Sequence, residues 1–249
     1  MPRTRPRTSR PAYRASAHGV GIQSCSGHGL TGPAASRKRA VSDHGPVNPS
    51  PRSWSLPLGA AYAGGVQLGA HALERLDPAE RERVLRGCST NVDNLDTGHW
   101  ETLLSSAFVV EEPMPLPYAL LLVAVLGYAE YAYGAWWTAA VFLFGHAAAT
   151  LLVYGALRRT ADRETRRALD VGTSYGFNAV LGALTSALPR GAVRNAARAG
   201  LLAVAAQPVL RRGRTFTDAG HLVALGVGIG LSVAVDCLSG SNHRKIAHT

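Results

Sequence analysis

One serine in the sequence has the surroundings of a nucleophile. Ser174 stands between Gly172 and Gly176, near the start of an apolar run at residues 170–188. At the start of a helix the backbone N–H groups have no helical partner and the dipole is positive, and both features stabilise an oxyanion. A serine in a membrane helix also commonly serves only to bind a neighbouring helix. The residues alone leave both roles open, nucleophile and packing residue.

A histidine at a matching depth supplies the base that a nucleophilic serine needs. His221 lies about five residues into an apolar run at 216–236, and Ser174 lies about four residues into its own run. In a chain with six membrane-crossing helices, the fourth and the sixth begin at the same membrane face. At about 1.5 Å per residue, both side chains then lie about 6–8 Å below that face. We therefore expect the two to meet, with Asp170 and Asp218 nearby but no acid required.

Six apolar runs, each near the length that crosses a bilayer, must position these two side chains. The runs are residues 54–73, 116–133, 136–156, 170–188, 193–210 and 216–236. Small residues permit close approach of the fourth and sixth helices, among them Ala179 on one and Ala224 and Gly228 on the other. The sequence therefore predicts an all-α, polytopic membrane protein with six transmembrane helices.

The chain divides into three parts by composition. Residues 1–53 are basic and rich in Ser, Gly and Pro, which predicts a disordered tail; residues 54–238 hold the apolar runs; residues 239–249 form a polar C-terminal tail. Much of the formal charge of +10 lies in the first part and in arginine clusters that flank the apolar runs. This pattern favours attraction to an anionic lipid bilayer, and not to nucleic acid, as the reason for the charge.

Other chemistry has little support in the sequence. The three cysteines, Cys25, Cys88 and Cys237, lie far apart and show neither metal-site nor disulfide spacing, and no cofactor motif is present. A small-molecule transporter is disfavoured, because no pair of broken helices with inverted correspondence is evident.

The segments around the apolar runs carry three further expectations. The polar loop at 74–115 joins the first and second runs on the face of Ser174, where it can cover a site, and Asp77-Pro78 predicts a helix start within it. His146, in the middle of the third run, is expected to be interior and hydrogen-bonded. Arg194, at the start of the fifth run, is expected to extend to the membrane interface.

At these positions the chain resembles the rhomboid intramembrane serine proteases, over residues 54–238. The family pattern Gly-x-Ser, with a second Gly eight residues after the serine, matches Gly172-Thr173-Ser174 and Gly182. The pattern of a small residue, His, and then Gly seven residues later matches Gly220-His221 and Gly228. The resemblance implies a rhomboid-like bundle in which the serine is the nucleophile and the histidine is the base.

A third match lies at the junction of the second and third helices, where Gly127, Glu130 and Gly134 follow the family spacing. The chain is also similar to the divergent bacterial rhomboid-like membrane proteins. The resemblance implies a multi-pass protein of the cell membrane whose partners are single-span membrane proteins. Ser174 and His221 are the site residues that it assigns.

The sequence departs from the family in two ways that bear on activity. Active rhomboids have Gly directly after the serine, whereas this chain has Tyr175, whose bulk is placed to obstruct a substrate. Their oxyanion-binding His and Asn correspond to Met114 and Tyr118, and losing one oxyanion donor costs about 10²–10³ in rate. Two functions stay open: an intramembrane serine protease, and a catalytically inactive rhomboid-like protein that binds client transmembrane helices.

Overall fold

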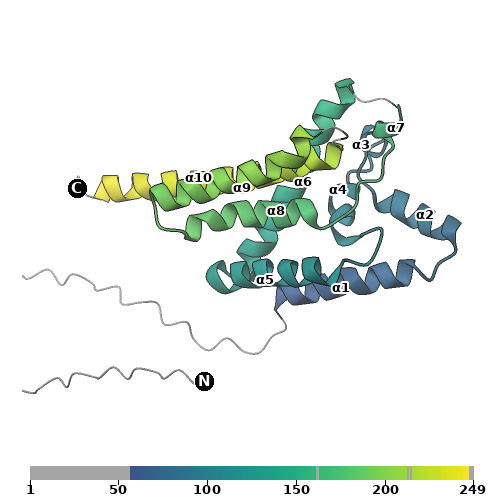
Figure 1. The fold of residues 1–249 in the computed structure, drawn as a ribbon, viewed down its shortest axis with the longest axis horizontal. Helices are drawn as coiled ribbons and strands as arrows, with labels where there is room; N and C mark the ends of the chain where they lie inside the picture. The colour runs from purple at the N-terminus through teal and green to yellow at the C-terminus, as the bar shows by residue number, and fades with distance from the viewer. Residues whose placement is uncertain (1–56, 161–162, 212, 214, 247–249) are drawn as a thin grey trace, which may run out of the picture. The chain divides into compact units, whose positions relative to one another are not determined.

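The computed structural model describes residues 57–160, 163–211, 213 and 215–246, and all regular elements within these ranges are helical (Figure 1). The longer helices are α1 (Leu58–Leu73), α5 (Leu116–Tyr133), α6 (Ala135–Thr160), α8 (Ser174–Ala183), α9 (Ala192–Leu210) and α10 (Phe216–Ile246). The all-α prediction is confirmed for this part of the chain. The predicted disordered tail at 1–53 lies outside the described residues.

Three of these helices are long and apolar enough to cross a membrane. They are Leu116–Tyr133, Ala135–Arg159 within α6 and Phe216–Val235 within α10. The other three of the six predicted spans do not meet this criterion within the described ranges. α1 has 16 residues, α8 has 10 before it tightens into the 3₁₀ turn η2 (Leu184–Ala187), and α9 carries Arg194 and Arg198 near its start.

The loop at 74–115 contains short helices. They are α2 (Pro78–Cys88), α3 (Val92–Asp96), α4 (Thr102–Ser105) and the 3₁₀ turn η1 (Ser106–Phe108). The predicted helix start is confirmed, because the Asp77 side chain accepts hydrogen bonds from two backbone N–H groups in the first turn of α2. Asn91 caps α3 in the same way, by accepting from the Asn94 N–H.

α8 packs against α10, α6 and α5, and its contact with α10 is close enough to require glycine (Figure 1). A Cβ on Gly182 would collide with the Leu225 carbonyl, and a Cβ on Gly228 would collide with the Ala179 carbonyl. Backbone approach at this distance maximises van der Waals contact between helices. The predicted small-residue interface between these two helices is confirmed.

α8 begins at Ser174, which corrects the predicted helical run at 170–188. The Gly172 N–H donates to the Ser106 carbonyl at 2.8 Å, so the backbone before the serine bonds to the loop and not to a preceding turn. Gly172 also has a φ of +148°, a conformation that a residue with a side chain rarely adopts. The residues before Thr173 are therefore not helical, Thr173 is the N-cap, and the serine becomes the first residue of the helix.

α10 extends beyond its predicted end at residue 236. The apolar part of the helix ends at Val235, but the backbone stays helical to Ile246. Residues 239–246, which composition assigns to the polar tail, therefore continue the helix. Apolar length defines a membrane span, whereas helical hydrogen bonds form equally between residues with polar side chains.

Arg194 does not extend to an interface as expected. Its side chain is buried, and its guanidinium donates to the Ser186 carbonyl at 2.7 Å and the Leu188 carbonyl at 2.9 Å. The 3₁₀ turn η2 ends at this point and leaves carbonyl groups that need donors. Arg198, one turn later, donates to the hydroxyl of Thr185. The start of α9 is thus bonded to the end of the α8–η2 segment.

We expect Arg194→Met to destabilise the protein by about 1–3 kcal/mol, because it leaves two carbonyls of half-buried residues without their donor. The measurement is chemical unfolding in detergent micelles. Arg75→Met is the matched control, since Arg75 is an exposed arginine after α1. Equal stability of the two variants would contradict the role assigned to Arg194.

Candidate functional site

The structure brings Ser174 and His221 into hydrogen-bond contact, with 2.8 Å between the serine Oγ and the histidine Nε2. The serine is the first residue of α8 and the histidine lies near the start of α10, so the starts of the two helices meet as predicted. Both side chains are half-buried. A hydroxyl bonded to an imidazole nitrogen is the arrangement in which histidine accepts the proton when serine attacks.

The N-terminus of α8 adds backbone donors beside the hydroxyl. The first helical hydrogen bond of α8 runs from the Phe177 N–H to the Thr173 carbonyl. The N–H groups of Ser174, Tyr175 and Gly176 therefore precede the helical ladder. The Ser174 N–H, at the positive end of the helix dipole, is suited to stabilise negative charge that develops on an oxygen next to the serine.

A cavity of about 250 Å³ lies beside the histidine, between α8, α9 and α10. Its polar lining consists of Asn178, Asp218 and His221, and the α9 side is apolar, as at Leu201. Asn178 follows Ser174 by one turn and donates to its carbonyl at 2.8 Å. The cavity therefore reaches the histidine of the pair from the side of α9.

Tyr175 is buried and does not line this cavity, which differs from the position expected from the sequence. Its side chain is only 3% exposed and lies between the rings of His146 and His221, with centroid distances of 5.9 and 5.6 Å. Its hydroxyl lies where a Cβ on Gly220 would be. Consecutive helical side chains point about 100° apart. While Ser174 bonds to His221, the next side chain turns into the bundle.

A second serine–histidine pair, which sequence reasoning missed, lies in the core. The Ser106 Oγ is 3.0 Å from the His146 Nε2, and the two residues are 1% and 3% exposed. The expectation of an interior, hydrogen-bonded His146 is confirmed. No local pattern could reveal a partner 40 positions earlier in the chain. Its burial keeps this pair from a substrate, whereas Ser174 is half-buried beside a cavity.

Met114 and Tyr118, which stand where the family has oxyanion donors, lie beside the residue before the serine. The Tyr118 hydroxyl is 2.8 Å from the Thr173 Oγ1, which donates to the Met114 Sδ at 3.9 Å. Each of the two hydroxyls can act as donor or acceptor in this bond. The Tyr118 O–H is thus engaged within the protein.

Neither nearby carboxylate is hydrogen-bonded to His221 within the described ranges. Asp218 caps α10, and its Oδ2 accepts from the Thr215 N–H at 2.8 Å and the Thr215 hydroxyl at 2.9 Å. Asp170 lies in the segment before α8, where burial raises the pKa of its carboxyl to about 7. The described residues also contain no group of three or more His, Cys, Asp or Glu that could hold a metal ion. The serine and the histidine thus form a hydrogen-bonded pair, called the dyad below, with no carboxylate bonded to the histidine among the described residues.

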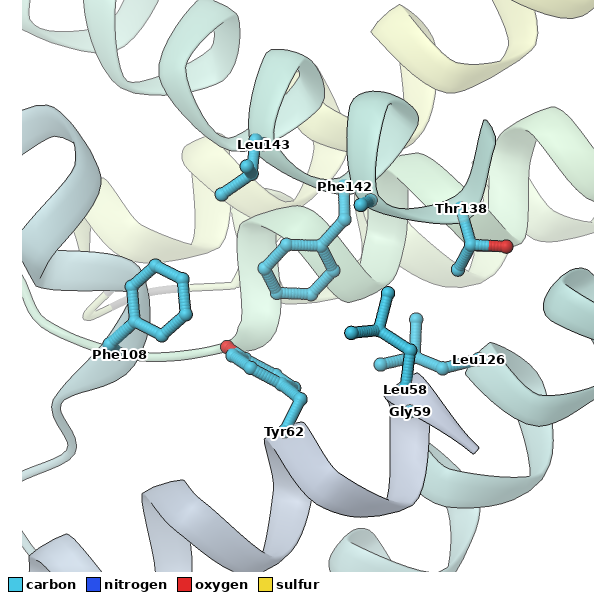
Figure 2. Close-up of a pocket in the computed structure, with 9 residues that line it drawn as sticks. Leu58, Gly59, Tyr62, Phe108, Leu126, Thr138, Phe142 and Leu143 are labelled. Carbon is cyan, nitrogen blue, oxygen red and sulfur yellow. The ribbon is translucent and has the colours of Figure 1, made fainter. Parts of the chain in front are cut away.

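A separate apolar cavity of about 90 Å³ lies between α1, α5 and α6 (Figure 2). Tyr62 lies between Phe108 and Phe142 there, with ring centroids 5.5 and 5.0 Å away. The Tyr62 hydroxyl donates to the Ala107 carbonyl, which joins α1 to the loop. Neither member of the dyad lines this cavity, so it is not part of the same site.

Comparison with models of known protein families assigns the chain to one family. A family model described as a rhomboid-like protein matches residues 64–240, a range that includes both Ser174 and His221. Searches of curated proteins and of solved structures found no match. The matched range covers most of the chain and all three helices that are long and apolar enough to cross a membrane. The chain therefore belongs to the rhomboid-like family of membrane proteins.

Proposed function

We propose that this protein is an intramembrane serine protease that cleaves single-span membrane proteins near one membrane face. The observation that carries the proposal is the 2.8 Å contact between the Ser174 Oγ and the His221 Nε2, in a half-buried position beside a cavity. Two further features support it: backbone N–H groups at the start of α8, and Tyr175 buried outside the lining of this cavity.

In the first step the Ser174 Oγ attacks the carbonyl carbon of the scissile peptide bond, and His221 Nε2 takes the hydroxyl proton. The Ser174 N–H stabilises the resulting oxyanion. His221 then gives the proton to the leaving nitrogen, the C–N bond breaks, and an ester to the serine is formed. The amine half of the substrate leaves at this stage.

In the second step water attacks the ester carbonyl while His221 takes one of its protons. The tetrahedral intermediate collapses, the C–O bond to the serine breaks, and the serine recovers its proton from the histidine. The new carboxyl end of the substrate leaves. This second step needs water at the dyad, and half-burial beside a cavity with polar lining residues supports such access.

The proposal includes a multi-pass protein of the cell membrane with six spans across residues 54–238. Ion pairs support one part of this topology. Asp96 pairs with Arg158 at 2.6 Å and Arg166 at 2.9 Å, and Asp93 pairs with Arg167 at 2.9 Å. The loop before α5 and the connection from α6 to α8 are therefore in contact, which supports the proposal that they lie at one membrane face.

The topology is tested by cysteine-accessibility mapping. Single cysteines at 80–110, 160–168 and 211–215 should be modified from one face, and cysteines at 189–192 from the other. The expected contrast is all-or-none for each residue, because an impermeant reagent reaches one side only. Finding 160–168 and 189–192 on the same face would disprove the six-span arrangement.

The protease activity is tested with a single-span reporter protein in liposomes. We expect the native chain to cleave the reporter near one membrane face, and Ser174→Ala to give no product. Gel analysis and mass spectrometry locate the cut. Cleavage that persists in Ser174→Ala would assign the activity to another residue or to a contaminant.

A catalytically inactive protein that binds client transmembrane helices is the second candidate function. The engagement of Tyr118 with Thr173 favours it, since neither Met114 nor Tyr118 supplies a free oxyanion donor. In this case the native chain retains the reporter in a pull-down without cutting it. Ser174→Ala then retains it equally well, because binding needs the surface and not the hydroxyl.

A further inference from the structure

The segment that leads into Ser174 is held by backbone hydrogen bonds to the loop between α2 and α5. The Gly172 N–H donates to the Ser106 carbonyl at 2.8 Å, and the Thr90 N–H donates to the Asp170 carbonyl at 3.2 Å. These bonds hold the non-helical segment directly before the start of α8. Ser106 and Thr90 thus hold the backbone of the residues directly before the dyad serine.

The side chains of the same two loop residues are bonded to each other and to α6. The Thr90 Oγ1 is 2.9 Å from the Ser106 Oγ, which is 3.0 Å from the His146 Nε2. Their exposed fractions are 0%, 1% and 3% in that order. A buried polar group that loses its partner has no water to replace it, so these bonds resist rearrangement. The chain of bonds connects the loop to α6, which itself packs against α8.

We propose that Thr90, Ser106 and His146 are positioning residues for Ser174, a role that rests on the proposed protease function. His146 holds the Ser106 side chain, and the Ser106 carbonyl holds Gly172, two residues before the serine. A displacement of about 1 Å at a reacting group costs about 10²-fold in rate. Loss of one hydroxyl from this buried chain therefore slows attack by Ser174 without a change at the dyad itself.

The test compares Thr90→Val, which removes the hydroxyl and keeps the shape, with Thr90→Ser, which retains the hydroxyl. Thr138→Val is the matched control: Thr138 is 3% exposed, and its hydroxyl bonds to the Gly134 carbonyl. Two quantities are measured in each variant. One is the rate at which a fluorophosphonate probe labels Ser174, and the other is hydrogen exchange at the Gly172 amide.

We expect Thr90→Val to be labelled about 10-fold to 100-fold more slowly, with faster exchange at Gly172. Thr90→Ser and Thr138→Val should match the native chain in both quantities. Exchange that is unchanged in Thr90→Val overturns the inference, and so does faster exchange with an unchanged labelling rate. An equal effect of Thr138→Val also overturns it, because general destabilisation would then be the cause.

Hydrogen exchange reports the hold on Gly172 without any catalysis, which separates this inference from the protease proposal. If Ser174 is not labelled even in the native chain, the protease proposal fails. The hold on the backbone before Ser174 is then judged by exchange alone: faster exchange at Gly172 in Thr90→Val supports it, and unchanged exchange overturns it. If the native chain is labelled and Thr90→Val exchanges normally, only the positioning role fails.

Discussion

His221→Ala slows the labelling of Ser174 by a fluorophosphonate probe by about 10²–10⁴-fold, and Ser174→Ala abolishes it. The probe reacts with a serine only when a base accepts the hydroxyl proton and the pocket is open. A positioned general base contributes an acceleration of this size. The 2.8 Å contact between the Ser174 Oγ and the His221 Nε2 assigns that base to one nitrogen atom. The measurement is time-resolved labelling in detergent, with the modified serine located by mass spectrometry.

The control for this experiment is His71→Ala. His71 is an exposed histidine of α1 whose ring lies beside Glu74, and it has no contact with the dyad. Its removal should leave the labelling rate unchanged. A native chain that folds but is not labelled would contradict the protease proposal and favour the client-binding function. Equal losses in His71→Ala and His221→Ala would show that labelling follows folding and not base catalysis.

The parts of the fold that follow from local chemistry could be predicted from the sequence. α5 has the predicted bounds of 116–133, because its apolar run ends at Gly134, whose φ of +94° closes the helix. The helix cap at Asp77 was also predictable, because a cap depends only on residues within one turn of the helix start. The meeting of Ser174 with His221 followed from counting helices and depths, which needs only approximate helix positions.

The remaining features depend on contacts between distant segments, and the sequence carries no signal for them. The start of α8 was placed too early because Gly172 bonds to Ser106, a residue of another loop. The His146 partner was missed for the same reason. The sequence placed Arg194 at the membrane interface because its hydrogen-bond acceptor could not be foreseen. This acceptor is a backbone carbonyl just after η2, and it is available because the 170–188 run ends in a 3₁₀ turn and not in a full helix.

The corrected direction of Tyr175 reverses the expectation for its replacement. If this side chain covered the serine, Tyr175→Gly would open the site and raise the labelling rate. The structure buries the ring in the bundle, against His221 and the Gly220 backbone. Truncation of a buried aromatic side chain costs about 3–5 kcal/mol, because it removes apolar contact and leaves a cavity. Tyr175→Gly should therefore lose stability and labelling together.

Tyr175→Phe is the variant that separates packing from any role of the hydroxyl. The Tyr175 hydroxyl has no hydrogen-bond partner among the described residues, so its removal relieves a buried unpaired group and changes stability by about 1 kcal/mol or less. The ring that lies edge-on to His221 at 5.6 Å is retained. We expect Tyr175→Phe to unfold like the native chain and to be labelled at a similar rate, while Tyr175→Gly is labelled far more slowly. Faster labelling of Tyr175→Gly would restore the obstruction hypothesis, and a large loss in Tyr175→Phe would assign the hydroxyl a part in the chemistry. Equal stability of the glycine variant and the native chain would mean that the ring does not pack in the core at all.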